Sequence, residues 1–169
     1  MRSTTTSLCL ATALLLATGT TGCSDDGEDP RLAVGTSATR ELEGGGKAVY
    51  TLKRVIDPAE MKPGELPPLL EIASWAALEL SFENVGQRDI EEQPFQRTAV
   101  GPRKGEKPLG TTAIDFEPVQ GPALPQVVRL KPGESVEGFL VMAVDRPGPV
   151  IGTVTYSLGR NGKIFWQVD

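Results

Sequence analysis

The stretch that decides the fold class of this chain is Trp75-Ala76-Ala77-Leu78-Glu79-Leu80-Ser81-Phe82-Glu83. Its residues alternate with a period of two, so one face of a strand would carry Ala76, Leu78, Leu80 and Phe82. A helix would spread the same side chains around its whole circumference. The stretch therefore predicts a β-strand with one buried face, as in an antiparallel sheet.

Similar strand signals lie on both sides of this stretch. They are rich in β-branched, aromatic or alternating residues, and glycine, asparagine and proline mark the turns between them. The predicted strands cover residues 36–42, 48–55, 126–130, 136–144, 150–158 and 164–168, with shorter strands or packed loop segments between 87 and 125. About seven or eight short strands, without a convincing long helix, predict an all-β chain folded as an antiparallel β-sandwich over residues 36–169.

Three connections have sequences that predict their own structure. Residues 57–70 hold four prolines, which exclude a regular helix or a central strand and so predict a loop. Lys131-Pro132-Gly133-Glu134 has proline and glycine at the two central positions of a type II turn. Asn161-Gly162 predicts a hairpin turn before the last strand.

The N-terminal segment predicts export from the cytoplasm. Arg2 gives a short positive region, and residues 8–17 are almost wholly apolar. Ten apolar residues are too few to cross a bilayer core of ~30 Å, which needs about 20. Residues 1–22 are therefore interpreted as a secretory signal peptide, which is removed from the mature protein.

The end of this segment, Thr20-Thr21-Gly22-Cys23, resembles the lipobox of bacterial lipoproteins. In that family a Leu, a small residue and Gly or Ala precede a Cys that receives a diacylglyceryl group and becomes the new N-terminus. Here Thr21, Gly22 and Cys23 match, and Thr20 stands where Leu is usual. The resemblance implies lipid attachment at Cys23 and a location on the extracytoplasmic side of the cell membrane. The alternative is an ordinary secretory signal, cut near Ala17 or Gly22, that leaves Cys23 as a free thiol.

The residues after Cys23 predict a flexible spacer. Residues 24–30 read Ser-Asp-Asp-Gly-Glu-Asp-Pro, which is polar and acidic, and we assign residues 23–35 to an acidic tether. Calcium binding by these carboxylates is the less favoured interpretation, because the Asp-x-Asp-x-Asp-Gly pattern of a ligand loop is missing.

Composition excludes several classes of function for the part that remains after processing. Without residues 1–22, whose only charged side chain is Arg2, the chain keeps 147 of 169 residues and 16 of 17 basic residues, against 22 acidic ones. A net charge of −6 with scattered basic residues argues against binding nucleic acid. The absence of histidine excludes a Ser-His-Asp triad and any histidine metal site.

Candidate catalytic and metal-binding residues are few. Glu91 and Glu92 are adjacent and would point to opposite faces of a strand, whereas Asp115 and Glu117 could share a face. No histidine activates the serines at positions 74, 81, 135 and 157, and a Ser-x-x-Lys spacing does not occur. Met61 and Met142 form no cluster for a soft metal, and Met142 is expected in the core. We expect a protein that is not an enzyme and has no cofactor.

The order of strands after residue 48 resembles a known domain type. The resemblance rests on residues 78–86 (Leu-Glu-Leu-Ser-Phe-Glu-Asn-Val-Gly), residues 130–141, which begin Leu-Lys-Pro-Gly-Glu, and the terminal Phe165-Trp166-Gln167-Val168. It is similar to the immunoglobulin-like domain of unknown function in Gram-positive surface lipoproteins, whose fold secreted mycobacterial immunoprotective antigens share. The resemblance implies an immunoglobulin-like sandwich and no catalytic residues.

The sequence thus predicts a lipid-anchored, non-catalytic interaction module with a protein or envelope partner. Its alternative is a secreted β-sandwich that binds a small molecule or carbohydrate in an apolar crevice. Trp75, Phe165 and Trp166 are candidate contact residues, although a core position is favoured for each. The proline-rich loop at residues 58–68 could be recognised as polyproline, but a rigid connector is favoured.

Overall fold

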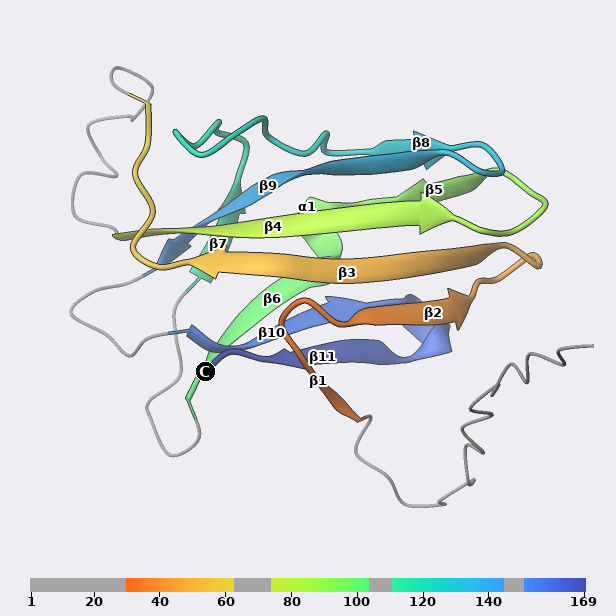
Figure 1. Ribbon diagram of the computed structural model, residues 1–169, viewed down its shortest axis with the longest axis horizontal. Helices are drawn as coiled ribbons and strands as arrows, with labels where there is room; N and C mark the ends of the chain where they lie inside the picture. Colours follow the sequence, from red (N-terminus) through yellow and green to blue (C-terminus); the bar gives the residue numbers. More distant parts are fainter. Residues whose placement is uncertain (1–29, 63–73, 104–110, 145–150) are drawn as a thin grey trace, which may run out of the picture.

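The computed structural model describes residues 30–62, 74–103, 111–144 and 151–169 (Figure 1). The predicted signal peptide, Cys23 and the tether up to residue 29 lie outside the described residues, as does part of the proline-rich loop. The elements are β1 (Arg31–Ala33), β2 (Ser37–Glu41), β3 (Lys47–Ile56), β4 (Ser74–Asn84), β5 (Ile90–Glu92), α1 (Pro94–Arg97), β6 (Thr98–Pro102), β7 (Thr111–Ile114), β8 (Val128–Leu130), β9 (Ser135–Val144), β10 (Ile151–Ser157), η2 (Gly159–Asn161) and β11 (Lys163–Gln167).

The strands form two main sheets and one small ladder. One sheet has the order β2-β3-β4-β9-β7, the other has the order β1-β11-β10-β6, and β5 pairs with β8 separately. In Figure 1 the long strands β3, β4 and β9 cross the molecule side by side, with β10 and β11 in the lower part of the view. The predicted all-β, immunoglobulin-like sandwich is confirmed, with the stretch around Leu78 at the centre of the five-stranded sheet.

The main hydrophobic core contains side chains from both sheets. The predicted inward face of β4 is confirmed, because Ala76, Leu78, Leu80 and Phe82 all belong to this core. Trp166 of β11 is fully buried in it, and its indole Nε1 donates to the Thr36 carbonyl at 3.0 Å. This bond ties the four-stranded sheet to the segment that enters β2.

The outer face of β4 is also covered over part of its length. Trp75 and Ala77 pack in a second cluster with Phe139 and Val141 of β9. Chain segments from outside these strands close over the cluster, through bridges that join Met61 to Pro118 and Ala123 to Phe139. The alternation of residues within β4 could not predict that its outer face is covered, because the covering residues come from distant parts of the chain.

Two expectations about the ends of the sandwich are corrected. The described residues contain eleven strands. One of them is β1, because Arg31–Ala33, which the sequence assigned to the tether, pair in parallel with β11. Three residues are too few to show an alternation, and β1 forms because β11 has a free edge there. The link before β11 is a 3-10 turn at Gly159–Asn161 followed by Gly162 with a φ of 90°, a longer connection than an Asn-Gly hairpin turn.

The link between β8 and β9 agrees with the sequence and helps to shape one end of the molecule. Gly133 has a φ of 81°, and Glu134 N–H donates to the Lys131 carbonyl at 3.0 Å, which confirms the type II turn. Asn84, at the end of β4, is fully buried, and its amide donates to the carbonyls of Arg88 at 2.8 Å and Leu130 at 2.9 Å. These bonds hold the segment between β4 and β5 in place.

Candidate binding pocket

A pocket of about 710 Å³ lies at the end of the sandwich where β2, β4 and β10 finish. In Figure 1 this is the right-hand end. Its walls come from the β2–β3 turn, the β4–β5 link with β5, the side chain of Arg97 in α1, and the β10–β11 link. We call this site the end pocket. Its lining residues are Leu42, Glu43, Gly44, Gly46, Arg88, Asp89, Ile90, Glu91, Glu92, Arg97, Leu158, Gly159, Arg160 and Asn161.

A buried carboxylate forms the base of the end pocket. Glu92 is 1% exposed, and its two oxygens accept bonds from Tyr50 at 2.7 Å, from Tyr156 at 2.6 Å and from the Arg97 guanidinium at 2.7 Å. The partners come from β3, β10 and α1, so one side chain links both sheets. A buried carboxylate requires such donors, because its loss of water is otherwise costly.

The two tyrosines are held as neutral donors. Burial raises the pKa of both phenols far above the ordinary value, and the nearby charge of Glu92 raises the pKa further. Their rings pack together, with 5.2 Å between centroids, and each ring also packs on Phe82. The phenolic hydrogens therefore remain available to the carboxylate.

We predict that the phenols of the folded protein will not ionise where free tyrosine does. The chain has only two tyrosines, so its phenolate absorbance reports on Tyr50 and Tyr156 alone. Because their folded pKa is raised, the associated stability is fully present below the ordinary pKa of 10.0 and is lost as the pH rises towards the folded value. An alkaline titration should show one abrupt rise in absorbance that coincides with unfolding. A gradual rise near pH 10.0 while the fold persists would contradict it, and a titration in denaturant is the control.

Arg97 places a positive charge in the pocket beside the buried carboxylate of Glu92. Its side chain is 35% exposed, and only one of its terminal nitrogens donates to Glu92 among the described contacts. A guanidinium has five N–H donors, so several remain for other partners. Because Glu92 is itself held by two phenols, the orientation of Arg97 is restricted before any ligand arrives.

The other charged residues of the pocket fall into two groups. Arg88 donates to the Gly44 carbonyl, and Glu91 pairs with Arg129 at 2.9 Å. The hydrogen bond and charge of Arg129 hold the pKa of Glu91 below its ordinary value. By contrast, Glu43, Asp89 and Arg160 make no ion pair within the described part of the chain, which leaves charges of both signs without a partner at the rim.

The structure also places the residues that the sequence analysis singled out as possible acids and bases. Glu91 and Glu92 do point to opposite faces, as predicted, since Glu91 is exposed and Glu92 is buried. Asp115 accepts a bond from Gln126 at 2.8 Å, and Glu117 pairs with Lys62 at 2.6 Å, so the two carboxylates have separate partners. The four serines lie on strands, Ser74 and Ser81 on β4, Ser135 on β9 and Ser157 on β10.

The aromatic and sulfur-containing candidates lie mainly in the core. Trp75 and Trp166 are buried, which confirms the favoured interpretation for both, whereas Phe165 is partly exposed. Met142 is buried in the main core, as predicted, and Met61 packs against the second cluster.

Among the described residues no group of three or more Cys, Asp or Glu side chains is placed to hold a metal ion. None of the helices in the described ranges is long and apolar enough to cross a membrane.

The network around Glu92 was not predicted from the sequence. One signal was available: Ile90 and Glu92 share one face of a three-residue strand, and Ile90 is an inward-facing residue. The partners could not be identified, because Tyr50 and Tyr156 lie 42 and 64 residues away from Glu92 in the chain.

No family model matches this chain, and no curated protein matches it in sequence. Solved structures are similar in fold. The secreted protein MPT63 of Mycobacterium tuberculosis matches with a TM-score of 0.59 at 10% identity, over 83% of this chain and 98% of that one. The yjhA protein of Bacillus subtilis matches with a TM-score of 0.53 at 14% identity, over 82% of this chain and 99% of that one. At these identities the likeness establishes a shared β-sandwich fold.

Proposed function

We propose that this protein is a membrane-anchored extracytoplasmic lipoprotein whose β-sandwich is a non-catalytic binding module of the cell envelope. The end pocket is its binding site. The observation that carries this proposal is the pair formed by Glu92 and Arg97 in the pocket lining, where a buried carboxylate held by two phenols fixes the position of a partly exposed guanidinium. Pockets that orient a ligand through a few fixed polar groups are typical binding sites.

The proposed location rests on the N-terminal sequence. Residues 1–22 have the pattern of a signal peptide, and Cys23 follows a lipobox-like sequence. The protein MPT63, which shares the fold, is described as secreted. An extracytoplasmic place for this chain is consistent with both observations.

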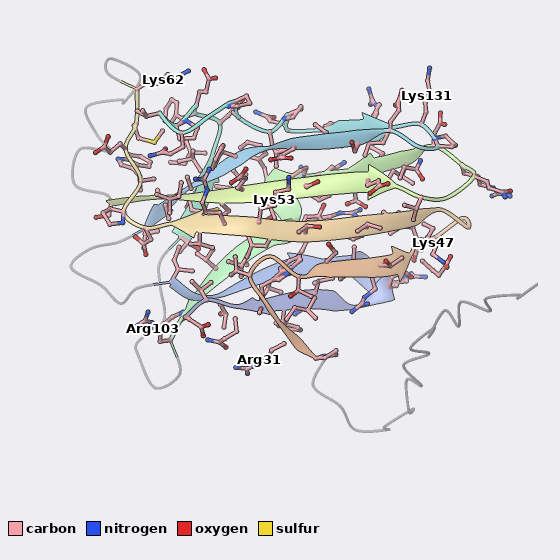
Figure 2. The ribbon with its side chains drawn as sticks, viewed as in Figure 1. Arg31, Lys47, Lys53, Lys62, Arg103 and Lys131 are labelled. Atoms are coloured by element: carbon pink, nitrogen blue, oxygen red, sulfur yellow. The ribbon has the colours of Figure 1, made fainter. Side chains whose placement is uncertain are left out.

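The charges of the surface favour a ligand other than nucleic acid. Figure 2 shows Arg31, Lys47, Lys53, Lys62, Arg103 and Lys131 spread over the whole view rather than gathered on one face. Lys47, Lys53 and Lys62 each pair with a glutamate, which reduces the local positive charge further. A nucleic-acid interface would need a continuous basic surface.

The lining of the end pocket supports the first of the two functions that the sequence predicts. Seven of its lining residues are Asp, Glu or Arg, and most others are small or polar. An apolar crevice for a small molecule or carbohydrate would expose hydrophobic and aromatic side chains instead. A binding module that recognises polar or charged groups fits the pocket better.

Photo-crosslinking in intact cells tests this proposal. A photo-reactive amino acid in place of Asn161, an uncharged residue of the end pocket, should give a discrete crosslinked product. The same group in place of Lys62, at the opposite end of Figure 2, is the control and should not give that product. Arg97→Gln should remove the product at position 161. Identical products from both positions, or no product from position 161, would contradict a binding role for this pocket.

A further inference from the structure

The chain has two asparagines, and their surroundings differ. Asn84 is fully buried. Its amide nitrogen donates to the carbonyls of Arg88 and Leu130, and its side-chain oxygen accepts from Gly86 N–H at 3.0 Å. Asn161 is partly exposed at the end of the 3-10 turn between β10 and β11, where it lines the end pocket. No hydrogen bond within the described part of the chain holds its side-chain amide, which is therefore free to change rotamer.

The residue that follows each asparagine differs as well. Gly162 follows Asn161 and has a φ of 90°, which a glycine adopts without strain. Because glycine has no Cβ, nothing on residue 162 hinders an approach to its backbone nitrogen. Asn84 is followed by Val85, whose branched side chain obstructs the same approach. The side-chain carbonyl carbon of Asn161 can therefore reach the next peptide nitrogen, whereas that of Asn84 cannot.

The backbone around Asn161 is only lightly restrained. Leu158 N–H donates to the Gly162 carbonyl at 2.9 Å and closes the link, but this bond uses neither the Asn161 amide nor the Gly162 nitrogen. Asn161 N–H donates to the Leu158 carbonyl at 3.3 Å, beyond the usual range of about 2.7–3.2 Å. A Cβ added to the exposed Gly159 would contact nothing within 4 Å. The peptide that joins residues 161 and 162 can therefore rotate without disturbing packed side chains.

We infer that Asn161 is a site of spontaneous deamidation, in which the Gly162 nitrogen attacks the side-chain carbonyl carbon of Asn161. Such an intramolecular attack is favoured where the reacting atoms can come into alignment. The Gly162 nitrogen gives its proton to hydroxide and bonds to Cγ, the Cγ–Nδ2 bond breaks, and Nδ2 takes a proton from water and leaves as ammonia. Water then opens the succinimide ring. Opening at Cγ gives aspartate, and opening at the main-chain carbonyl carbon gives isoaspartate, so water is the only reagent consumed.

Deamidation changes the end pocket, because either product adds a carboxylate to its lining. The lining already holds four acidic side chains against three arginines, so the conversion increases an existing excess of negative charge. Isoaspartate also lengthens the main chain by one methylene group directly before β11. A charged ligand would therefore bind differently to aged protein. That consequence rests on the proposed function, whereas the deamidation itself does not.

Prolonged incubation of the full chain in detergent at mildly alkaline pH tests the inference. Isoelectric focusing should show a new acidic form at the position of the Asn161→Asp variant. Asn161→Gln is the matched control and should not develop this form at a comparable rate, because its longer side chain must close a larger ring. Mass spectrometry of peptides should assign the exchange of an amino group for a hydroxyl to residue 161. Asn84 should convert at least about tenfold more slowly, because its hydrogen bonds must break first.

Incubation in denaturant separates the effect of the fold from that of the sequence. The difference between the two asparagines should narrow there, because Asn84 loses its hydrogen bonds, although glycine still favours Asn161. The inference is overturned if the folded protein gives no acidic form, if Asn161→Gln gives it equally fast, or if Asn84 converts as fast as Asn161. The proposed function is judged separately, because the photo-reactive variant has no asparagine at position 161.

Discussion

Replacement of Glu92 by alanine is expected to lower the free energy of unfolding by about 3–5 kcal/mol, the usual cost of breaking a buried charged pair. The carboxylate is 1% exposed, and it accepts bonds from Tyr50, Tyr156 and Arg97. Without it, two buried phenols lose their acceptor, at about 1–3 kcal/mol for each unsatisfied group. The half-buried Arg97 also loses its counter-charge, although water reaches this residue and reduces the cost.

The neighbouring carboxylate supplies a matched control for this experiment. Glu91 is on the same strand but is exposed and pairs with Arg129 at the surface, where ion pairs contribute little to stability. Glu91→Ala should leave the urea-unfolding midpoint almost unchanged, whereas Glu92→Ala should lower it strongly with an unchanged slope. Equal midpoints for the two variants would show that the Glu92 network does not hold the sheets together. Glu92→Gln should fall between them, because its amide keeps one acceptor oxygen.

Replacement of Cys23 by serine is expected to transfer the protein from the membrane fraction to the medium. Each buried CH₂ of an acyl chain contributes about 0.8 kcal/mol to membrane binding, and one chain anchors a protein only marginally. A diacylglyceryl group on Cys23 carries two chains and exceeds that threshold. A serine hydroxyl cannot form the thioether, so the variant loses the whole anchor rather than part of it.

Fractionation of cells that express each variant measures this effect. The other cysteine of the chain, Cys9, lies within the predicted signal peptide and provides the control. Cys9→Ser should remain in the membrane fraction, because the lipobox-like sequence is intact. Mass spectrometry of the mature N-terminal peptide should show an acylated Cys23 in the unmodified protein. An unacylated peptide, or a Cys23→Ser variant that stays with the membrane, would contradict lipid anchoring.

Several elements of the fold are readable from local sequence because their causes are local. The strand at Ser74–Asn84 follows from alternation alone, since a period of two is imposed by the pleat of a strand. The turn at Lys131–Glu134 follows from the restricted φ of proline and the positive φ that glycine allows. The strand at Arg31–Ala33 was not predicted, since these three residues form a strand only because the edge of β11 is free beside them.

The candidate site also combines features with a local cause in the sequence and features that depend on distant residues. A glutamate beside an isoleucine on one short strand could indicate an inward-facing acid, but its partners could not be named from the chain order. Tyr50 and Tyr156 reach Glu92 from β3 and β10, which belong to different sheets. The charged residues at the rim of the pocket likewise lie in links that precede or follow strands of both sheets.

Neighbouring residues alone were sufficient to determine the class of fold and the position of most strands, and they also predict lipid attachment at Cys23. These properties depend on periodicity, turn chemistry and a short apolar segment, all of which act within about ten residues. The end pocket and its buried carboxylate depended on long-range pairing of the chain. Residues 42 and 64 positions from Glu92 in the chain contact it only where both sheets pack together, and donors from both sides offset the cost of burying its charge.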